Sequence, residues 1–241
     1  MSGTLHVLGL GPGDPELMTV RAARLLRETT NIAYFRKPGR AGQAWTIANK
    51  LFPTSSEQIV FEYPFTTEIE LHDPRYLLQM NDFYESCAKR LSQRLTSGRH
   101  VALLCEGDPF FYGSAMYLYD RLRQTHPTEI TPGVSGMSGC WSRSGTPITH
   151  GDDVLSVLPG TLPEAELVAR LQACDAAVIM KIGRNLLKIR AALTKAGVIG
   201  RAIYVERGTM EDEIILPFVE LARDHAPYFA LVLIPGRQAA R

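Results

Sequence analysis

Residues 101–114 read VALLCEGDPFFYGS, and this stretch decides the fold class. Its first five residues are apolar, as in a strand that is buried on both faces of a sheet. The run then ends in an acidic residue, a glycine, a second acidic residue and a proline, followed by three aromatic residues. Two acidic residues, a glycine and a proline at the end of a buried strand predict that the following loop binds a ligand.

Similar apolar runs recur along the chain and predict further buried strands. They are Leu5–Leu8, Val154–Leu158, Ala176–Met180, Ala202–Val205 and Phe229–Ile234. Helical patterns lie between them over about 163–171 and 186–196. Strands that alternate with helices predict an α/β fold with a mostly parallel sheet in the first half. The segment Tyr204–Leu216 leaves room for two adjacent strands, so we expect a mixed second sheet.

The clearest helical pattern has Asp73 as its N-cap and Pro74 at its first position, and it stops at Gly98. Its apolar face carries residues at helical spacing. They are Leu77, Met80, Tyr84, Cys87, Leu91 and Leu95. A second helix start is predicted by Thr161 and Glu164, which have the spacing of a capping box.

The chain has 241 residues, enough for one large or two modest domains. The stretch RLRQTHPTEITPGVSG, which begins at Arg121, strings together polar and turn-forming residues. We therefore predict two abutting α/β domains, 1–125 and 126–241.

Composition restricts the function. The formal net charge is +1, so a broad positive surface for nucleic acid is not expected. The four cysteines are far apart and have no histidines at metal-ligand spacing, which disfavours both a metal site and a disulfide framework. Neither a leader peptide nor a membrane-spanning run is apparent, so the expected location is the cytoplasm.

Three more glycine-bearing loops follow predicted strands, at the edge where open α/β sheets bind ligands. They are GLGPGD at 9–14, PGVSG at 132–136 and ERGT at 206–209. GLGPGD lacks the third glycine of a dinucleotide fingerprint, and Pro12 and Pro15 prevent an immediate helix start. An NAD-dependent dehydrogenase is therefore a poor interpretation.

Taken together and in order, several motifs resemble the tetrapyrrole methylase family, which transfers methyl groups from S-adenosylmethionine to corrin and sirohaem precursors. The motifs are GLGPGDPELMTVRAARLL, EGDPFFYGS, TPGVSGMSGC and VIMKIGRN. EGDPFFYGSAMYL, LSVLPGTLP, AAVIMKIGRN and YVERGTMEDE are also similar to the branch that methylates precorrin-2 at C-20, giving precorrin-3A on the way to cobalamin.

The resemblance implies two α/β domains, a cofactor cleft between them and a homodimer. The first domain would lie on the substrate side and the second would complete the cofactor site. The residues that match the family's cofactor contacts are Gly107, Asp108, Phe111, Ser135, Gly136, Met180 and Gly208. Gly107 and Asp108 would meet the amino-acid or ribose end, whereas Met180 and Gly208 would border the adenine.

The chemistry of the methyl donor determines which catalytic groups the protein is expected to need. A sulfonium methyl is already activated, so the protein needs neither a metal nor a covalent nucleophile, and its main task is alignment. A proton must leave the macrocycle after the attack of its meso carbon. Asp14 matches the family's proposed proton acceptor, and Glu106 is the second candidate. Water or a substrate carboxylate is an alternative acceptor.

A substrate with eight carboxylates requires local basic residues. Arg36, Lys37 and Arg40 follow one strand, and Lys181 and Arg184 follow another. Each of these could equally be a solvated loop charge. Alternatives to the C-20 reaction are methylation at another corrin position, of cobalt-factor II, of diphthine or of ribosomal RNA. A non-catalytic module that binds the cofactor is an alternative of another class.

Overall fold

The computed structural model describes residues 2–65 and 74–236 of the chain. Contacts divide the chain into two compact units, Met1–Gly136 and Met137–Arg241. Each unit is built of helices packed on a five-stranded sheet. The predicted α/β class is therefore confirmed.

The sheet of the first unit has the strand order β3-β2-β4-β1-β5, and every pairing in it is parallel. Its strands are β1 (Leu5–Gly9), β2 (Asn31–Arg36), β3 (Glu57–Glu62), β4 (Val101–Cys105) and β5 (Thr128–Thr131). The central strand β4 is buried along its whole length, as its apolar run predicted. The parallel sheet expected in the first half of the chain is confirmed.

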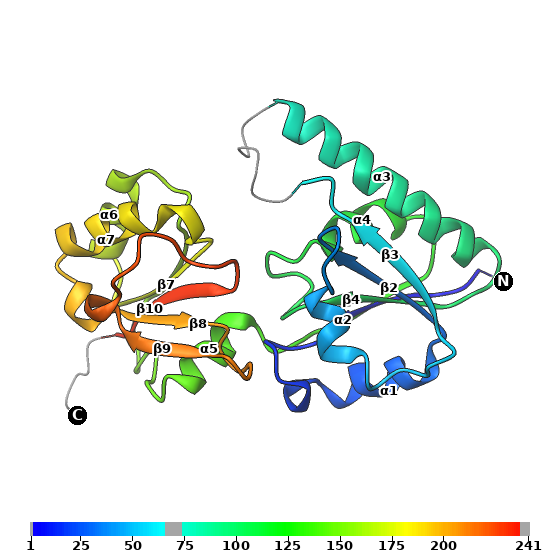
Figure 1. The fold of residues 1–241 in the computed structure, drawn as a ribbon, viewed down its shortest axis with the longest axis horizontal. Coiled ribbons are helices and arrows are strands. Elements are labelled where there is room, and N and C mark those ends of the chain that lie inside the picture. Colours follow the sequence, from blue (N-terminus) through cyan, green and yellow to red (C-terminus); the bar gives the residue numbers. More distant parts are fainter. Residues whose placement is uncertain (1, 66–73, 237–241) are drawn as a thin grey trace. The chain divides into compact units, whose positions relative to one another are not determined.

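Helices cover both faces of this sheet (Figure 1). On one face, α1 (Val20–Glu28) and α2 (Gln43–Ala48) bury apolar side chains against β1, β2 and β4. On the other, α3 (Pro74–Thr96) and α4 (Ala115–Leu122) pack against alternate residues of the same strands. The three inner strands β1, β2 and β4 thus bury both of their faces, which explains their near-continuous apolar runs.

Helix α3 carries most of its predicted apolar face inward, from Met80 to Leu95. Leu77, which the pattern assigns to the same apolar face, is 61% exposed. The predicted N-cap, Asp73, lies outside the described residues.

The sheet of the second unit has the order β6-β7-β10-β8-β9. Its strands are β6 (Leu155–Pro159), β7 (Ala176–Met180), β8 (Ile203–Glu206), β9 (Ile214–Pro217) and β10 (Ala230–Ile234). Strands β6 and β7 are parallel, whereas β10 runs antiparallel to β7 and β8, and β9 antiparallel to β8. The mixed second sheet and the two adjacent strands within Tyr204–Leu216 are confirmed. Strand β6 lies at the sheet edge and is only partly buried, so the prediction that it is buried on both faces was wrong.

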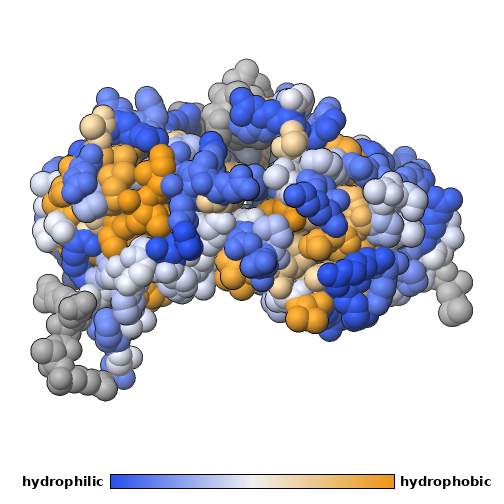
Figure 2. Space-filling view, turned by 60° about the horizontal axis from the view of Figure 1, so that its bottom comes forward, coloured by the Kyte–Doolittle hydropathy of each residue, from blue (hydrophilic) through white to orange (hydrophobic). Residues whose placement is uncertain are grey.

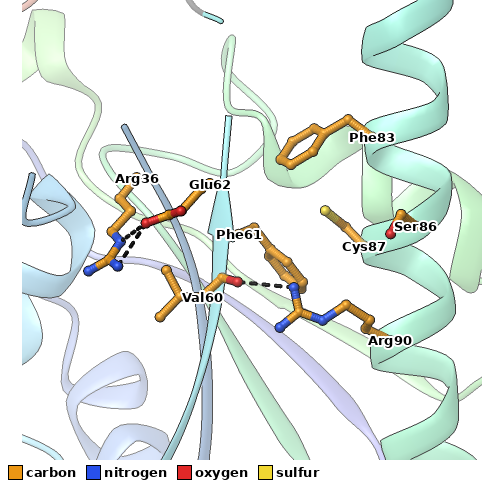
Figure 3. Close-up of a pocket in the computed structure, with 8 residues that line it drawn as sticks. All are labelled: Arg36, Val60, Phe61, Glu62, Phe83, Ser86, Cys87 and Arg90. Carbon is orange, nitrogen blue, oxygen red and sulfur yellow. Dashed lines mark hydrogen bonds and ion pairs between the residues drawn. The ribbon is translucent and has the colours of Figure 1, made fainter. Parts of the chain in front are cut away.

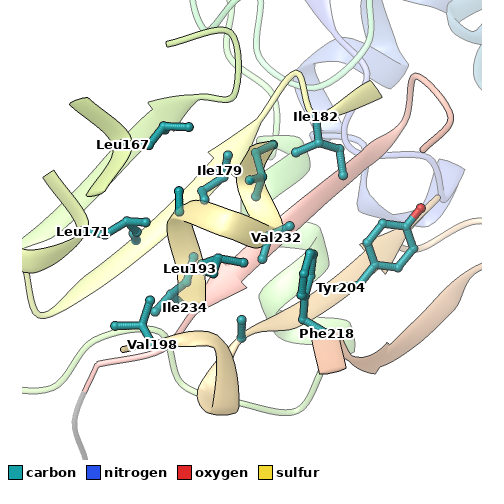
Figure 4. Packing of buried hydrophobic residues seen from close by; sticks show 14 of the residues in the cluster. Leu167, Leu171, Ile179, Ile182, Leu193, Val198, Tyr204, Phe218, Val232 and Ile234 are labelled. Atoms are coloured by element: carbon teal, nitrogen blue, oxygen red, sulfur yellow. The ribbon is translucent and has the colours of Figure 1, made fainter. Parts of the chain in front are cut away.

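Two helices, α6 (Glu164–Gln172) and α7 (Leu186–Lys195), pack on one face of this sheet (Figure 4). On the other face, α5 (Gly136–Arg143) buries Cys140 against Val178, Val205 and Leu231. The N-cap of α6 is Pro163, and no side chain bonds the first turn, so the predicted capping box of Thr161 and Glu164 was wrong. Short 3₁₀ turns complete the described elements: η1 (Pro15–Leu17), η2 (Gly183–Asn185), η3 (Ile199–Arg201) and η4 (Phe218–Glu220).

On the face drawn in Figure 2, hydrophobic patches alternate with hydrophilic side chains. Large hydrophobic side chains that are at least half exposed include Val20, Leu77, Leu78, Val219 and Tyr228. Across residues 2–65 and 74–236, no helix is both long and apolar enough to span a membrane.

Candidate functional site

The chain leaves neighbouring strands β1 and β4 in opposite directions. The connection after β1 leads to α1 on one face of the sheet, and the connection after β4 leads to α4 on the other. Open α/β sheets bind their ligands at such a divergence, beyond the carboxyl ends of the two strands. The loops GLGPGD and EGDPFFYGS lie at these strand ends, as the sequence predicted, and this edge of the sheet is called the crevice below.

Three strand tips meet there through their glycines. The amide of Gly107 donates to the carbonyl of Gly11 at 2.8 Å, which joins the loops after β4 and β1. A Cβ on Gly133, after β5, would lie 2.1 Å from the carbonyl oxygen of Gly107. A Cβ on Gly9 would lie 2.7 Å from the Cα of Gly133. These loops touch backbone to backbone, and no side chain fits between them.

The carboxylate of Asp108 joins the loop after β4 to the loop after β5. Its Oδ1 accepts the amide of Phe110 at 2.9 Å, and its Oδ2 accepts the amide of Gly133 at 3.1 Å. A carboxylate oxygen has two acceptor positions, so each oxygen retains one for a further donor. Asp108 therefore holds the predicted cofactor loops in place, whatever else it binds.

The carboxylate of Glu106 points towards the opposite neighbour, β2. Its Oε1 accepts the amide of Ala44, in the first turn of α2, at 2.9 Å. Burial raises the pKa of the Glu106 carboxyl, although hydrogen bonds from its own amide and that of Ala44 oppose the shift. Glu106 and Asp108 thus flank Gly107 and fasten it to loops on either side.

Asp14 ends the loop after β1 and is partly exposed. It is the N-cap of η1, and its Oδ1 accepts the amide of Glu16 at 2.8 Å. Helix α1 begins only at Val20, so the prediction that Pro12 and Pro15 prevent an immediate helix start is confirmed.

The structure brings together three of the predicted cofactor residues. A Cβ on Gly107 would lie 3.4 Å from the amide nitrogen of Gly136 and 3.9 Å from the Cα of Ser135. A Cβ on Gly136, where α5 begins, would meet nothing within 4 Å, so there is open space beside it. Phe111 lies in the adjoining loop, with its ring 4.9 Å from that of Tyr112.

Two further predicted cofactor residues lie in the second unit. Val232 of β10 pairs with both Ile179 and Tyr204, which places Met180 level with Val205 on the other side of β10. Met180 and Val205 are therefore two strand spacings apart, about 10 Å. Gly208 follows β8 in a turn that packs on α5, because a Cβ there would lie 2.6 Å from Sγ of Cys140.

Backbone strain is concentrated in these loops. Among the described residues, four non-glycine residues have positive φ: Tyr112, Lys181, Arg207 and Thr209. Each lies in a loop that carries a predicted cofactor or substrate residue. Left-handed conformations are costly for residues with a Cβ and are typical of ligand-binding segments.

An ion pair that sequence reasoning missed holds the strained turn around Gly208. Glu213 accepts hydrogen bonds from Nε of Arg143 at 2.9 Å and from the amide of Thr209 at 2.9 Å. The bond to Arg143 lowers the pKa of Glu213 below its usual value. No spacing in the sequence indicates this pair, because 70 residues separate its members.

The predicted substrate residues lie at the ends of β2 and β7. Arg36 is paired with Glu62, its cross-strand neighbour on β3, with Nη2 2.8 Å from Oε1. Lys37 and Arg40 lie in the following turn, closed by the amide of Arg40 on the carbonyl of Lys37 at 3.2 Å. Lys181 and Arg184 follow Met180, with Arg184 in η2.

Arg36 also borders an open pocket of about 470 Å³ at the edge of the first sheet (Figure 3). On its far side, Arg90 of α3 donates to the carbonyl of Val60 at 3.0 Å and stacks on Phe61. The pocket is lined by Arg36, Val60, Phe61, Glu62, Phe83, Ser86, Cys87 and Arg90. Within the described part of the chain, no group of three His, Cys, Asp or Glu side chains is placed to hold a metal ion.

The sequence model of the Tetrapyrrole (Corrin/Porphyrin) Methylases matches residues 4–221. The chain belongs to this family. It is 50% identical to a precorrin-2 C(20)-methyltransferase of Sinorhizobium sp, over 97% of this chain and 96% of that protein. It is 27% identical to a cobalt-precorrin-2 C(20)-methyltransferase of Salmonella typhimurium, over 97% of each.

Solved structures share the fold. A cobalt precorrin-4 methyltransferase of cobalamin biosynthesis superposes with a TM-score of 0.72 at 22% identity, over 96% of this chain and 94% of that one. A uroporphyrin-III C-methyltransferase of Thermus thermophilus, complexed with S-adenyl homocysteine, gives a TM-score of 0.63 at 21% identity, over 97% and 92%.

Proposed function

We propose that the protein is an S-adenosylmethionine-dependent methyltransferase that methylates precorrin-2 at C-20, giving precorrin-3A in cobalamin biosynthesis. The observation that carries this proposal is the 50% identity to a precorrin-2 C(20)-methyltransferase along nearly the whole of both chains. A cobalt-bearing form of the same substrate is the second candidate, favoured by the 27% identity to the Salmonella relative.

The residues of the first unit fit such a methyl donor. The loops after β1, β4 and β5 approach one another closely through their glycines, and open space lies beside Gly136. The first N–H groups of α5 have no acceptor within the helix, so they suit a carboxylate or ribose oxygen. Gly107, Ser135 and Gly136 would bind the donor through the backbone, and Phe111 would exclude water. Asp108 would hold the loops and could accept one further hydrogen bond on each of its two oxygens.

For the second unit, the proposal rests on the resemblance of motifs. Met180 would border the adenine and Gly208 would contact it through its backbone. The turn around Gly208 is held in one conformation by Glu213, Arg143 and Cys140, which favours a preformed contact.

The donor supplies an activated sulfonium methyl group, so the protein's residues have to align the acceptor carbon and exclude water. Alignment of this kind can lower the activation barrier by about 7 to 11 kcal/mol. Alignment requires loops of fixed conformation, and the close backbone contacts among Gly9, Gly107 and Gly133 favour this.

We propose Asp14 as the group that accepts the proton from the methylated macrocycle. Asp14 is partly exposed at the end of the loop after β1, and its carboxylate is oriented by the amide of Glu16. Glu106 is the second candidate, although its carboxylate already accepts a hydrogen bond from Ala44. The acidic arms of the substrate would meet Arg36, Lys37, Lys181 and Arg184.

We further propose that the first unit, Met1–Gly136, is the substrate-side domain and that the second unit, Met137–Arg241, completes the cofactor site; the boundary expected at residue 125 moves because β5 belongs to the first sheet. The four free cysteines suit the cytoplasm, where thiols stay reduced. A homodimer would cover some of the exposed hydrophobic side chains, and light scattering after gel filtration tests it.

The experiment that tests the function is incubation with precorrin-2 and S-adenosylmethionine labelled in its methyl group. The expected product has gained one labelled methyl, which NMR assigns to C-20. A label at another carbon, or turnover of only the cobalt-bearing substrate, would favour the alternatives. Binding of S-adenosylhomocysteine without turnover of either substrate would indicate a non-catalytic module.

A further inference from the structure

We infer that Glu106 is a positioning residue that holds the basic turn between β2 and α2 in the conformation that receives the acidic substrate. The inference rests on the proposed function for the nature of the substrate. It differs from the role of proton acceptor, because Glu106 would act through the backbone of residues 37–44 and not on the reacting atoms.

The first observation is the hydrogen bond across the sheet. Glu106 follows β4, and its Oε1 accepts the amide of Ala44 at 2.9 Å. This amide belongs to the first turn of α2, where N–H groups have no acceptor in the helix. The N-cap residue, Gly42, has no side chain that could take this place. A carboxylate 62 positions away in the sequence therefore caps this helix.

The second observation is that the turn is folded tightly on β2. A Cβ on Gly42 would lie 2.5 Å from the carbonyl oxygen of Phe35. The amide of Arg40 closes the turn on the carbonyl of Lys37, and Gly39 has a φ of +69°. The turn is thus closed on itself, and its end is held by β2 at Gly42 and by Glu106 at Ala44.

The third observation is the distribution of charge. The turn carries Lys37 and Arg40 and directly follows Arg36, which is paired with Glu62. These residues are the basic segment at the crevice end of β2. The ammonium group of Lys37 can bind a substrate carboxylate only if the backbone of the turn holds Lys37 in place. Release of the turn would therefore weaken substrate binding. The donor site at Gly107 would be spared, since its contacts to Gly11 and Gly133 do not involve this turn.

The test compares Glu106→Gln, Glu106→Ala and a control, Glu28→Gln, whose carboxylate is exposed and pairs with Arg24. Glutamine keeps an acceptor oxygen and loses the ability to take a proton, whereas alanine loses both. In the free protein, hydrogen exchange of the peptide that holds residues 37–44 should accelerate about tenfold in Glu106→Ala and little in Glu106→Gln.

In turnover, Glu106→Ala should raise the KM for precorrin-2 about tenfold while kcat and the affinity for S-adenosylhomocysteine change less than about twofold. Glu106→Gln should recover most of the loss, and Glu28→Gln should match the wild type.

Two results would overturn the inference. Unchanged exchange over residues 37–44 in Glu106→Ala would show that Glu106 does not hold the turn. An equal fall of kcat in Glu106→Gln and Glu106→Ala at constant KM would show that Glu106 itself takes the proton. Wild-type protein that neither binds S-adenosylhomocysteine nor methylates precorrin-2 would instead overturn the proposed function, and the exchange measurement would still decide whether Glu106 holds the turn.

Discussion

Oδ2 of Asp108 accepts the amide of Gly133 at 3.1 Å, so the loop after β4 is hydrogen bonded to the loop after β5. Between these strands lies β1, whose own loop is joined to Gly107. One acidic side chain therefore joins the two loops that carry the predicted cofactor residues of the first unit, and the backbone of Gly107 joins the loop after β1 to them.

Replacement of Asp108 by alanine should weaken the binding of S-adenosylhomocysteine. The change removes the acceptor for the amides of Phe110 and Gly133, and a partly buried donor left without its partner costs about 1 to 3 kcal/mol. That cost corresponds to roughly 5- to 150-fold in affinity, measured by titration calorimetry. Asp108→Asn keeps an acceptor oxygen and should lose less. Equal losses in both variants would indicate that the charge of Asp108 meets the donor directly.

Gly133→Ala and Gly136→Ala form a matched pair. A Cβ on Gly133 collides with the backbone of Gly107, so this variant should be destabilised by about 3 kcal/mol or more. A Cβ on Gly136 meets nothing, so this variant should unfold at the wild-type temperature but bind S-adenosylhomocysteine more weakly. Thermal unfolding and calorimetry separate the two effects. Normal cofactor affinity in Gly136→Ala would show that Gly136 does not contact the cofactor.

Asp14→Asn should leave the affinity for S-adenosylhomocysteine unchanged and slow the single-turnover rate about 100-fold, the lower end of the usual contribution of a general base. Asparagine keeps the oxygen that accepts the amide of Glu16, so the loop should retain its conformation. A wild-type rate in rapid-quench measurements would show that another group or water takes the proton.

Glu106 and Glu213 should give opposite pH dependences of stability. Burial raises the pKa of Glu106, so ionisation of this carboxylate disfavours the folded state. The wild type should therefore lose stability relative to Glu106→Gln as the pH rises from the unfolded pKa of about 4.3 through the folded pKa. Urea titrations between these limits measure the difference, and a constant difference would contradict the shift.

The hydrogen bond from Arg143 lowers the pKa of Glu213, so its charged form stabilises the folded state above the unfolded pKa. That stabilisation should disappear as the pH falls through the folded pKa. At neutral pH, Glu213→Ala should reduce the free energy of unfolding by about 1 to 2 kcal/mol. It should also weaken cofactor binding, since the turn around Gly208 would be released. Unchanged stability at neutral pH would show that the pair contributes nothing.

Much of the fold follows from local patterns in the sequence. The runs Val101–Cys105 and Ala176–Met180 are strands with the predicted bounds, because strands buried on both faces need continuous apolar residues. Strand β3 was not predicted, since it lies at the sheet edge and has only three consecutive apolar residues, between Gln58 and Glu62. The capping box at Thr161 failed for a related reason, because a spacing of residues does not fix the backbone that a cap requires.

The sequence predicted which loops gather at one edge of the first sheet, because the carboxyl ends of parallel strands lie together there. It could not predict what the carboxylates do there. Glu106 and Asp108 look alike in EGD, yet one holds Ala44 and the other Gly133. Those partners follow from the strand order β2-β4-β1-β5, which cannot be inferred from a single sequence motif.

The most direct test of the central claim is a crystal structure of the protein with S-adenosylhomocysteine. The account predicts the ligand at the crevice between β1 and β4, with its polar groups on the backbone of Gly107, Ser135 and Gly136. Density for the ligand at another edge of the sheet, with these loops unoccupied, would contradict it.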